Sequence, residues 1–166
     1  MAACSVDKKV LVTGGAGFIG SALVRKLLKE QYEVTVFDDL STGLRDSLPE
    51  NTKLRFVQGD VRDFESVSSA IRKHPYVMPL AAQAFVPLGY QKPVQVAAVN
   101  ALGSLNVFKA CLDHGIKRLV HISSSEVYGT AQYTPMNEQH PLHPHSTYAV
   151  AKACMLSHTA RHADQD

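Results

Sequence analysis

A tyrosine and a lysine, Tyr148 and Lys152, stand four residues apart where a helix is predicted to begin. This spacing puts two side chains on one face of a helix, one turn apart. A free tyrosine, with a pKa of about 10, is a poor base at neutral pH, but a fixed cation beside it favours the phenolate. Such a phenolate can remove the proton of a substrate hydroxyl. The same spacing is also common on exposed helices that do no chemistry.

A run of hydroxyls and a carboxylate, Ser123-Ser124-Ser125-Glu126, closes the predicted fifth strand. Open α/β sheets bind ligands at the carboxyl ends of their strands, so a hydroxyl here could donate a hydrogen bond to a reacting oxygen. Serine runs also form turns without any chemistry. The residues alone leave both interpretations open.

A glycine-rich turn is the strongest local signal in the chain. Gly14, Gly17 and Gly20 follow the apolar strand of residues 10–12 and lead directly into a helix. In this context the early glycines allow a tight turn and close approach to a pyrophosphate, and the last glycine lets the helix pack on the strand. The helix N-terminus adds free N–H groups and the positive end of a dipole. The turn therefore predicts dinucleotide binding.

Two acidic residues support this prediction. Asp38 closes the predicted second strand, roughly 20 residues after the turn, where a carboxylate accepts hydrogen bonds from the adenosine ribose. Because no arginine stands beside Asp38 to meet a 2′-phosphate, NAD is favoured over NADP. Asp60 closes the predicted third strand at the same edge of the sheet. It is either a cofactor ligand or an acid that starts a helix or a turn.

Strands and helices that alternate along the chain must position these residues. The predicted strands are Lys9–Thr13, Glu33–Asp38, Leu54–Gly59, Tyr76–Ala81 and Lys117–Ser123. The predicted helices are Phe18–Gln31, a helix capped by Asp63 that ends near Lys73, a long helix from near Pro93 to a C-cap near Gly115, and a last one from near Thr147. A loop from Gly129 to Ser146 precedes the last helix. This alternation predicts an α/β fold, a Rossmann-type doubly wound parallel sheet in one domain, residues 1–166.

The composition excludes several classes of protein. The 166 residues are 45% hydrophobic and 19% charged, with a net charge of +2 and no basic stripe, so nucleic acid is not an expected partner. No apolar run reaches the roughly 20 residues of a membrane span, and residues 1–9 lack a secretory signal, so we expect a cytoplasmic protein that binds no membrane. We expect reduced thiols at Cys4, Cys111 and Cys154. Prolines interrupt the histidines at 140, 143 and 145, so no metal site is expected.

Together these motifs resemble the extended short-chain dehydrogenase/reductase family, specifically its NAD-dependent nucleotide-sugar epimerases and dehydratases. The resemblance rests on motifs that occur in order between about Lys8 and Lys152. They are Thr13-Gly14-Gly15-Ala16-Gly17-Phe18-Ile19-Gly20, the stretch from Phe37 to Gly43, Gly59-Asp60-Val61, Leu80-Ala81-Ala82-Gln83, Asn100 with Gly103 and Asn106, Ser-Ser-Ser-Glu-Val-Tyr-Gly and Tyr-x-x-x-Lys.

The resemblance implies roles for the catalytic candidates. The family's trio of Ser or Thr, Tyr and Lys falls on Ser124, Tyr148 and Lys152, with Ser125 as the alternative serine. Family members oxidise C4 of the sugar transiently, with the tyrosine as base and bound NAD as hydride acceptor, and the 4-keto sugar then rearranges. Glu126 matches an acid that assists the second step in dehydratase-like and decarboxylase-like relatives. Ser125 stands where glucose dehydratases carry Asp, so the branch stays open.

The resemblance also implies cofactor and partner contacts. The cofactor-binding residues would be Gly14, Gly17, Phe18, Ile19, Gly20, Asp38, Asp60, Val61, Ala81, Ala82, Gln83, Asn100, Tyr148 and Lys152. Of these, Phe18 and Ile19 would lie at the pyrophosphate, and Asp60 and Val61 near adenine. The substrate would be a nucleotide-diphosphate sugar. Relatives pair the helices that carry Asn100 and Tyr148, which implies a homodimer.

Two departures from the family pattern remain. Pro79 replaces a histidine in the predicted fourth strand and removes a backbone donor, so local strain is expected there. Family members also continue past the last helix with further strands and a C-terminal domain that holds the substrate, so the fold is expected to be truncated before these parts. The alternative hypotheses are therefore a non-catalytic dinucleotide-binding module and an inactive truncated fragment of such an enzyme.

Overall fold

The computed structural model describes residues 8–163, with side chains up to residue 156. The chain divides into two compact units. The first comprises Met1–Ala81 and Asn106–His121, and the second comprises Ala82–Leu105 and Ile122–Asp166. The single domain expected over residues 1–166 stays a prediction. The thiol expected at Cys4 lies outside the described residues.

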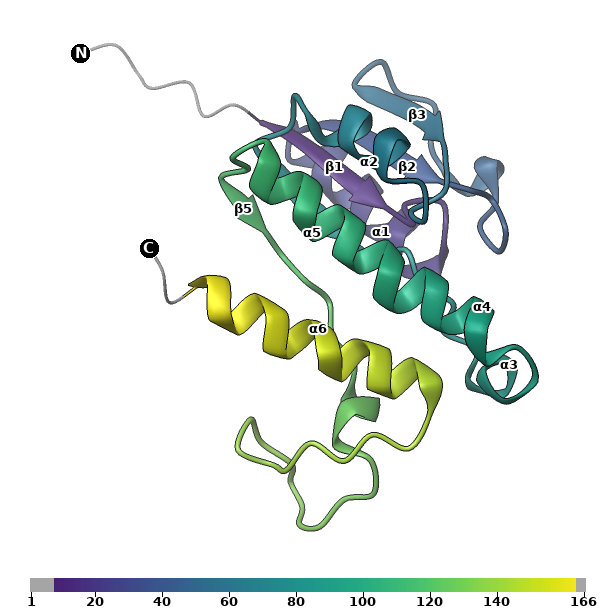
Figure 1. Ribbon diagram of the computed structural model, residues 1–166. Coiled ribbons are helices and arrows are strands. Elements are labelled where there is room, and N and C mark those ends of the chain that lie inside the picture. The colour runs from purple at the N-terminus through teal and green to yellow at the C-terminus, as the bar shows by residue number, and fades with distance from the viewer. Residues whose placement is uncertain (1–7, 164–166) are drawn as a thin grey trace. The chain divides into compact units, whose positions relative to one another are not determined.

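The first unit is built on a parallel sheet (Figure 1). Among the described residues the sheet has five strands in the order β3-β2-β1-β4-β5. The strands are β1 (Lys9–Thr13), β2 (Glu33–Asp38), β3 (Leu54–Gln58), β4 (Tyr76–Pro79) and β5 (Arg118–Leu119). β1 pairs with both β2 and β4, and the strand order reverses there, as in doubly wound sheets. This confirms the predicted α/β fold class.

Helices cover both faces of this sheet. α1 (Phe18–Lys29) packs Val24 and Leu28 against valines of β1 and β2 on one face. On the other face α2 (Phe64–Ile71) lies beside the first-unit part of α5 (Gly103–Asp113), where Ser68 Oγ is 2.9 Å from His114 Nε2. The core of the first face consists of Val10, Val12, Ala16, Val24, Leu28, Val34, Val36 and Leu48. Burial on both faces explains the uninterrupted apolar runs of the central strands.

α2 begins at its predicted cap. The Asp63 carboxylate accepts a hydrogen bond from the Ser66 N–H, with Oδ1 and N 3.3 Å apart. This contact satisfies one of the N–H groups that a helix start leaves without a partner. The helix ends at Ile71, slightly before the predicted end near Lys73.

β5 is much shorter than predicted, and Pro79 explains why. The Val120 N–H donates to the Val77 carbonyl, with N and O 3.0 Å apart. In a parallel ladder the next donor on this side of β4 would be the N–H of residue 79, directed at the Val120 carbonyl. Proline has no N–H, so the ladder stops, and the strand predicted over Lys117–Ser123 is wrong beyond Leu119.

The strain expected at Pro79 falls on one side of β4 alone. Thr13 of β1 still pairs with Pro79, and the Leu80 N–H donates to the Thr13 carbonyl over 3.0 Å. The donor that proline lacks would face β5 instead. The ladder between β1 and β4 is therefore complete, and the missing hydrogen bond is one between β4 and β5.

The second unit is helical within its described residues. It contains α3 (Val86–Gln91), α4 (Pro93–Ala97), the π-helical turn η2 (Ala98–Leu102), the first residues of α5, the 3-10 turn η3 (Ser125–Tyr128) and α6 (Thr147–Ala163). The first unit adds one short 3-10 turn, η1 (Arg45–Ser47). α6 starts at Thr147, as predicted, and packs against α3, α4, η2 and η3. The sequence does not predict α3, because Pro87 and Gly89 within it favour a loop.

The long helix predicted from near Pro93 to near Gly115 has an irregular centre. Its start at Pro93 is confirmed, and Gly115 has a φ of +59°, which suits a glycine just after a helix end. Between α4 and α5, however, the chain forms the π-helical turn η2 with Asn100 inside it. Such turns insert into α-helices, often at functional sites.

The loop predicted from Gly129 to Ser146 is confirmed and is ordered around a buried histidine. His140 is 3% exposed. Its Nε2 accepts a hydrogen bond from the Gln132 N–H over 3.0 Å, and its Nδ1 lies 3.0 Å from the Pro141 carbonyl. The buried ring therefore joins two parts of the same loop, near Gln132 and near Pro141.

Neither a membrane span nor a metal cluster is found in the part of the chain that the structure describes. No described helix is both long and apolar enough to cross a bilayer. No group of three His, Cys, Asp or Glu side chains is arranged to hold a metal ion within the described residues.

Two free thiols differ strongly in environment. Cys111 is buried on α5, and burial raises the pKa of its thiol to about 12, whereas Cys154 on α6 is exposed. Because the thiolate is the reactive form, we expect iodoacetamide at pH 8 to label Cys154 at least about 100-fold faster than Cys111 in the native chain. Peptide mass spectrometry over time measures both rates. Both rates are measured in a chain that carries Cys4→Ser, which removes the third thiol. Equal labelling rates for Cys111 and Cys154 would contradict the burial of Cys111.

Candidate functional site

The glycine turn of the first unit closes tightly on itself. Gly14 has a φ of +67°, and its N–H donates to the Phe37 carbonyl over 2.9 Å. A β-carbon on Gly14 would lie 2.6 Å from the Ala81 nitrogen, and one on Gly20 would lie 2.1 Å from the Gly14 carbonyl oxygen. Neither position accepts a side chain, so both glycines serve the close packing that the sequence predicts.

The start of α1 is open to a ligand. Gly17 occupies the N-cap position and offers no side-chain cap. The N–H groups of Phe18, Ile19 and Gly20 have no partner within the helix, as in any first turn. Phe18 is 96% exposed and Ile19 is exposed beside it, although both are large and apolar. An anionic group fits here, because the uncapped N–H groups and the helix dipole both favour it.

Asp38 is built into the same turn. It is 7% exposed at the end of β2, and both carboxylate oxygens accept backbone hydrogen bonds. Oδ2 accepts from the Ala16 N–H and Oδ1 from the Leu40 N–H, each over 2.9 Å. Each oxygen keeps a second lone pair that can accept from a ribose hydroxyl. Asp38 thus shapes the turn through both of its carboxylate oxygens.

Replacing Asp38 by Asn tests this structural role. The amide supplies one acceptor and one donor group, so either Ala16 or Leu40 would face an N–H instead of an oxygen. We expect the free energy of unfolding to fall by about 1–3 kcal/mol, measured by urea denaturation. The matched control is Asp39→Asn, because the exposed Asp39 bonds the Ser41 N–H through Oδ1 alone. Equal effects at both positions would refute the double contact.

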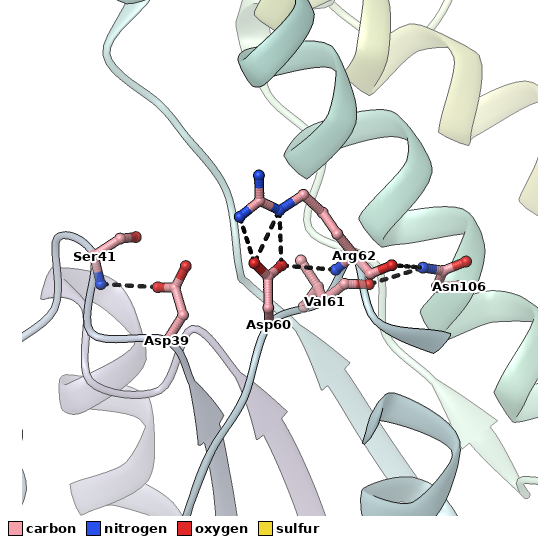
Figure 2. Close-up of polar contacts among 6 residues, drawn as sticks. All are labelled: Asp39, Ser41, Asp60, Val61, Arg62 and Asn106. Carbon is pink, nitrogen blue, oxygen red and sulfur yellow. Dashed lines mark hydrogen bonds and ion pairs between the residues drawn. The ribbon is translucent and has the colours of Figure 1, made fainter. Parts of the chain in front are cut away.

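Figure 2 shows a polar cluster at the end of β3 in the first unit. Arg62 grips both oxygens of the Asp60 carboxylate, with Nε 3.0 Å from Oδ1 and 2.9 Å from Oδ2. Mainly through this hydrogen bonding, Arg62 holds the pKa of Asp60 below its usual range. Asn106 donates to the carbonyls of Val61 and Arg62, both over 3.0 Å. The cluster fixes the backbone on either side of Val61.

Asp60 therefore acts as a turn-forming acid, which is one of the two roles expected for it. Its Oδ1 also accepts the Arg62 N–H over 2.8 Å. Arg62 could not be singled out from the sequence, because an arginine two residues after an aspartate is usually an ordinary surface residue.

In the second unit, Asn100 holds the backbone of Gln83. Asn100 is 1% exposed within η2, and its Oδ1 accepts the Gln83 N–H over 2.8 Å. Its Nδ2 donates to the Gln83 carbonyl over 3.0 Å. One amide thus pairs with both polar groups of one residue. Gln83 is itself buried and Ala82 is half-buried, so this segment of the expected cofactor site has a fixed backbone.

Lys152 is buried in the second unit on α6. It is 5% exposed, and its Nζ donates to the Ile122 carbonyl over 2.8 Å. Burial lowers the pKa of Lys152 from its ordinary value. A lysine in this environment is not a surface residue. The alternative that Lys152 lies on an exposed helix face without any chemistry therefore does not apply. Tyr148 precedes it by one turn and is half-buried.

Ser124 caps the 3-10 turn η3, which packs against α6. Its Oγ accepts the Glu126 N–H over 3.3 Å, which leaves the hydroxyl proton available for donation. Ser125 and Glu126 are exposed. No hydrogen bond joins Ser124, Tyr148 and Lys152 to one another among the described contacts, so the trio shares a unit without being linked directly.

Gly129 is a position that the sequence analysis missed. Its φ is +66°, and a β-carbon there would lie 2.0 Å from the His143 carbonyl oxygen. The glycine lets the chain turn sharply after η3 toward the loop that precedes α6. The glycine of the Val-Tyr-Gly motif was the available signal.

Comparisons with known proteins agree with this geometry. The family model described as GDP-mannose 4,6 dehydratase matches residues 11–165. A UDP-glucose 4-epimerase of Lactobacillus helveticus is 40% identical over 149 residues, which cover 89% of this chain and 44% of the relative. A dTDP-glucose 4,6-dehydratase of Streptomyces antibioticus is 35% identical over 152 residues, covering 87% and 45%. The UDP-glucose 4-epimerase of Thermus thermophilus, solved with NAD, superposes with a TM-score of 0.86 and 38% identity over 94% of this chain and 51% of that one.

The chain therefore belongs to the GDP-mannose 4,6 dehydratase family, and the resemblance to extended short-chain dehydrogenase/reductases is confirmed. It spans about half the length of the relatives it matches.

Proposed function

We propose that this chain is the NAD-binding part of an NAD-dependent nucleotide-sugar epimerase or dehydratase. The observation that carries the proposal is the likeness, over 94% of the chain, to a UDP-glucose 4-epimerase in complex with NAD. The open start of α1 and the constrained glycine turn in the first unit support it independently, because they suit a pyrophosphate.

Each unit contains residues that are expected to contact NAD. In the first unit, Gly14 to Gly20 would hold the pyrophosphate and Asp38 the ribose, with Asp60 and Val61 at adenine. In the second unit, the Gln83 backbone held by Asn100 would contact the cofactor. When bound, NAD accepts a hydride from the sugar and returns it later. Arg62 is paired with Asp60 and so is not free to bind a 2′-phosphate, which supports NAD over NADP.

Tyr148 would act as the base for the C4 hydroxyl of the sugar. Its phenolate takes the hydroxyl proton, and the buried Lys152 ammonium, one turn away, stabilises that phenolate. The Ile122 carbonyl orients the ammonium through the 2.8 Å hydrogen bond. Ser124 donates its hydroxyl proton to the same C4 oxygen while the Glu126 N–H holds its Oγ. All of these groups lie in the second unit.

Glu126 would select the reaction that the 4-keto sugar undergoes. A ketone at C4 acidifies the neighbouring C–H bond, so a carboxylate close to it can remove that proton and start a dehydration. Glu126 is exposed and carries no ion pair among the described residues, so it is available for this role. Where the C4 ketone is simply reduced from its other face, the product is the 4-epimer.

The chain would also form a homodimer through the helices that carry Asn100 and Tyr148. Leu102, Leu105 and Val150 on these helices are exposed apolar residues of the second unit. Such residues are typical of helix-pairing surfaces. Light scattering after gel filtration tests this, and a monomer at about 100 μM would rule it out at ordinary interface affinities.

Two experiments test the proposed function. Saturable quenching or enhancement of NADH fluorescence by the chain, with NADPH at least about tenfold weaker, is expected from Asp38. No binding at millimolar NADH would refute the cofactor proposal. The second test incubates the chain, and a form extended to the length of its relatives, with nucleotide-diphosphate hexoses and follows the sugar by proton NMR. Absence of any 4-keto or epimerised product from both forms would refute the enzyme proposal and favour a non-catalytic binding module.

A further inference from the structure

A surface hollow opens at the amino ends of the strands of the first unit. Two adjoining parts, of about 400 and 480 Å³, share Thr35, Arg55, Lys73 and His74 as lining residues. One part extends along α2 and the other along the starts of β1, β2 and β3. The glycine turn, Asp38 and Asp60 follow the carboxyl ends of the same strands. The hollow is therefore separate from the expected cofactor site.

The charge around the hollow is strongly one-sided. Its cations are Lys9, Lys53, Arg55, Arg72 and Lys73. Glu33 is the single carboxylate among its lining residues, which leaves an excess of four positive charges. The whole chain carries a net charge of +2, so the rest of the chain is net negative. None of the five cations takes part in an ion pair within the described residues.

His74 lies between the two parts and responds to these charges. Its Nε2 is 2.8 Å from the Thr35 hydroxyl. Burial lowers the pKa of His74, hydrogen bonding to the backbone of Ile71 and Ala70 raises it in part, and the positive charges of Arg55 and Lys9 lower it by a smaller amount. The five cations thus create a positive potential inside the hollow that its single carboxylate, Glu33, offsets only in part.

Neutral donors accompany the cations. Ser66 and Ser69 of α2 line one part, and Thr52 lines the other. A guanidinium and an ammonium beside hydroxyl groups match the oxygens of a phosphate, with the Arg55 fork able to bind two of them. Several cations in one hollow favour a ligand with more than one negative charge. The hollow is confined, and no basic stripe continues from it along the sequence, which favours a small molecule over a nucleic acid.

We propose that this hollow is a second anion-binding site, which takes a small molecule bearing phosphate groups through Arg55, Lys73 and the α2 hydroxyls. The site does not rest on the proposed function, since none of its residues belongs to the expected cofactor or catalytic set. A ligand bound here would contact α2 and the starts of β1, β2 and β3.

Calorimetric titration of the 166-residue chain with inorganic pyrophosphate tests the site. The variant Arg55→Ala/Lys73→Ala is expected to bind at least about tenfold more weakly, because it removes two charge-assisted contacts from exposed positions. The variant Lys26→Ala/Lys29→Ala on α1 removes the same charge elsewhere and is expected to change the affinity less than about twofold. If Arg55→Ala/Lys73→Ala binds pyrophosphate as tightly as the wild type, the anion binds at the start of α1 or elsewhere. This result would overturn the proposal.

NMR of His74 gives a second readout that needs no substitution. A bound anion offsets the charges of Arg55, Lys9 and Lys73, so the pKa of His74 is expected to rise when pyrophosphate is added. Glu33 is the one carboxylate that also lines the hollow. A His74 titration curve that is identical with and without saturating pyrophosphate would also overturn the proposal.

Discussion

Substitution of Gly14 by alanine is expected to destabilise the chain by roughly 3 kcal/mol or more, a large effect for a single methyl group. Two costs add at this position. The φ of +67° is unfavourable for alanine by roughly 1 kcal/mol, and the new β-carbon would lie 2.6 Å from the backbone of Ala81, which cannot move aside without disturbing the end of β4. Urea denaturation measures the loss, and NADH binding is expected to disappear with it.

Two other glycines separate these costs. Gly115 has a φ of +59° with nothing near its missing β-carbon, so Gly115→Ala is expected to cost only about 1 kcal/mol. Gly17 has a φ of −76° and its nearest contact would be 3.3 Å away, so Gly17→Ala is expected to change stability by less than about 1 kcal/mol. A Gly14→Ala variant as stable as Gly115→Ala would show that the turn opens easily, contrary to this structure.

The largest effect on activity is expected from Tyr148→Phe. If Tyr148 is the base, loss of its hydroxyl lowers kcat by a factor of about 10² to 10⁴ in the form of the protein that turns over sugar. KM is expected to change little, because the ring remains and its place on α6 is unaltered. Steady-state kinetics at several pH values measure both constants.

Cys154→Ser is the matched control for this prediction. Cys154 is exposed on the same helix and is not one of the proposed catalytic residues, so kcat is expected to be unchanged. A Tyr148→Phe variant that keeps more than about a tenth of the kcat of the parent protein would exclude Tyr148 as the base, since a positioned base contributes at least about 10².

The parts of the fold set by local pattern were predictable. β1 and β2 have the predicted ends, because each is a buried apolar run that stops at a turn residue. The Asp63 cap and the left-handed Gly115 follow from local chemistry in the same way. The short β5 was not foreseen, because the missing donor is on Pro79, in a different strand. The effect becomes visible once the pairing of β4 with β5 is known.

In the candidate site, too, some features were predictable from the sequence and others depend on tertiary packing. The sequence singled out Asp38 and Asn100 as cofactor contacts, but their bonds within the protein join residues 22 and 17 positions apart. Contacts at such separations depend on how the strands and helices pack. The burial of Lys152 is also a tertiary effect, since the Ile122 carbonyl that holds it lies 30 residues earlier in the chain. The roles in binding and catalysis stay predictions.

The end of the β4–β5 ladder has a consequence for motion. Two residue pairs hold β5 in place, whereas β1 and β2 share five. Short ladders at a sheet edge open with little free energy, and their amide hydrogens exchange early. We therefore expect the Val120 amide to exchange orders of magnitude faster than that of Val12 in the central strand. Local opening can release β5 while β1, β2 and β3, whose carboxyl ends lead to Gly14, Asp38 and Asp60, keep their pairing.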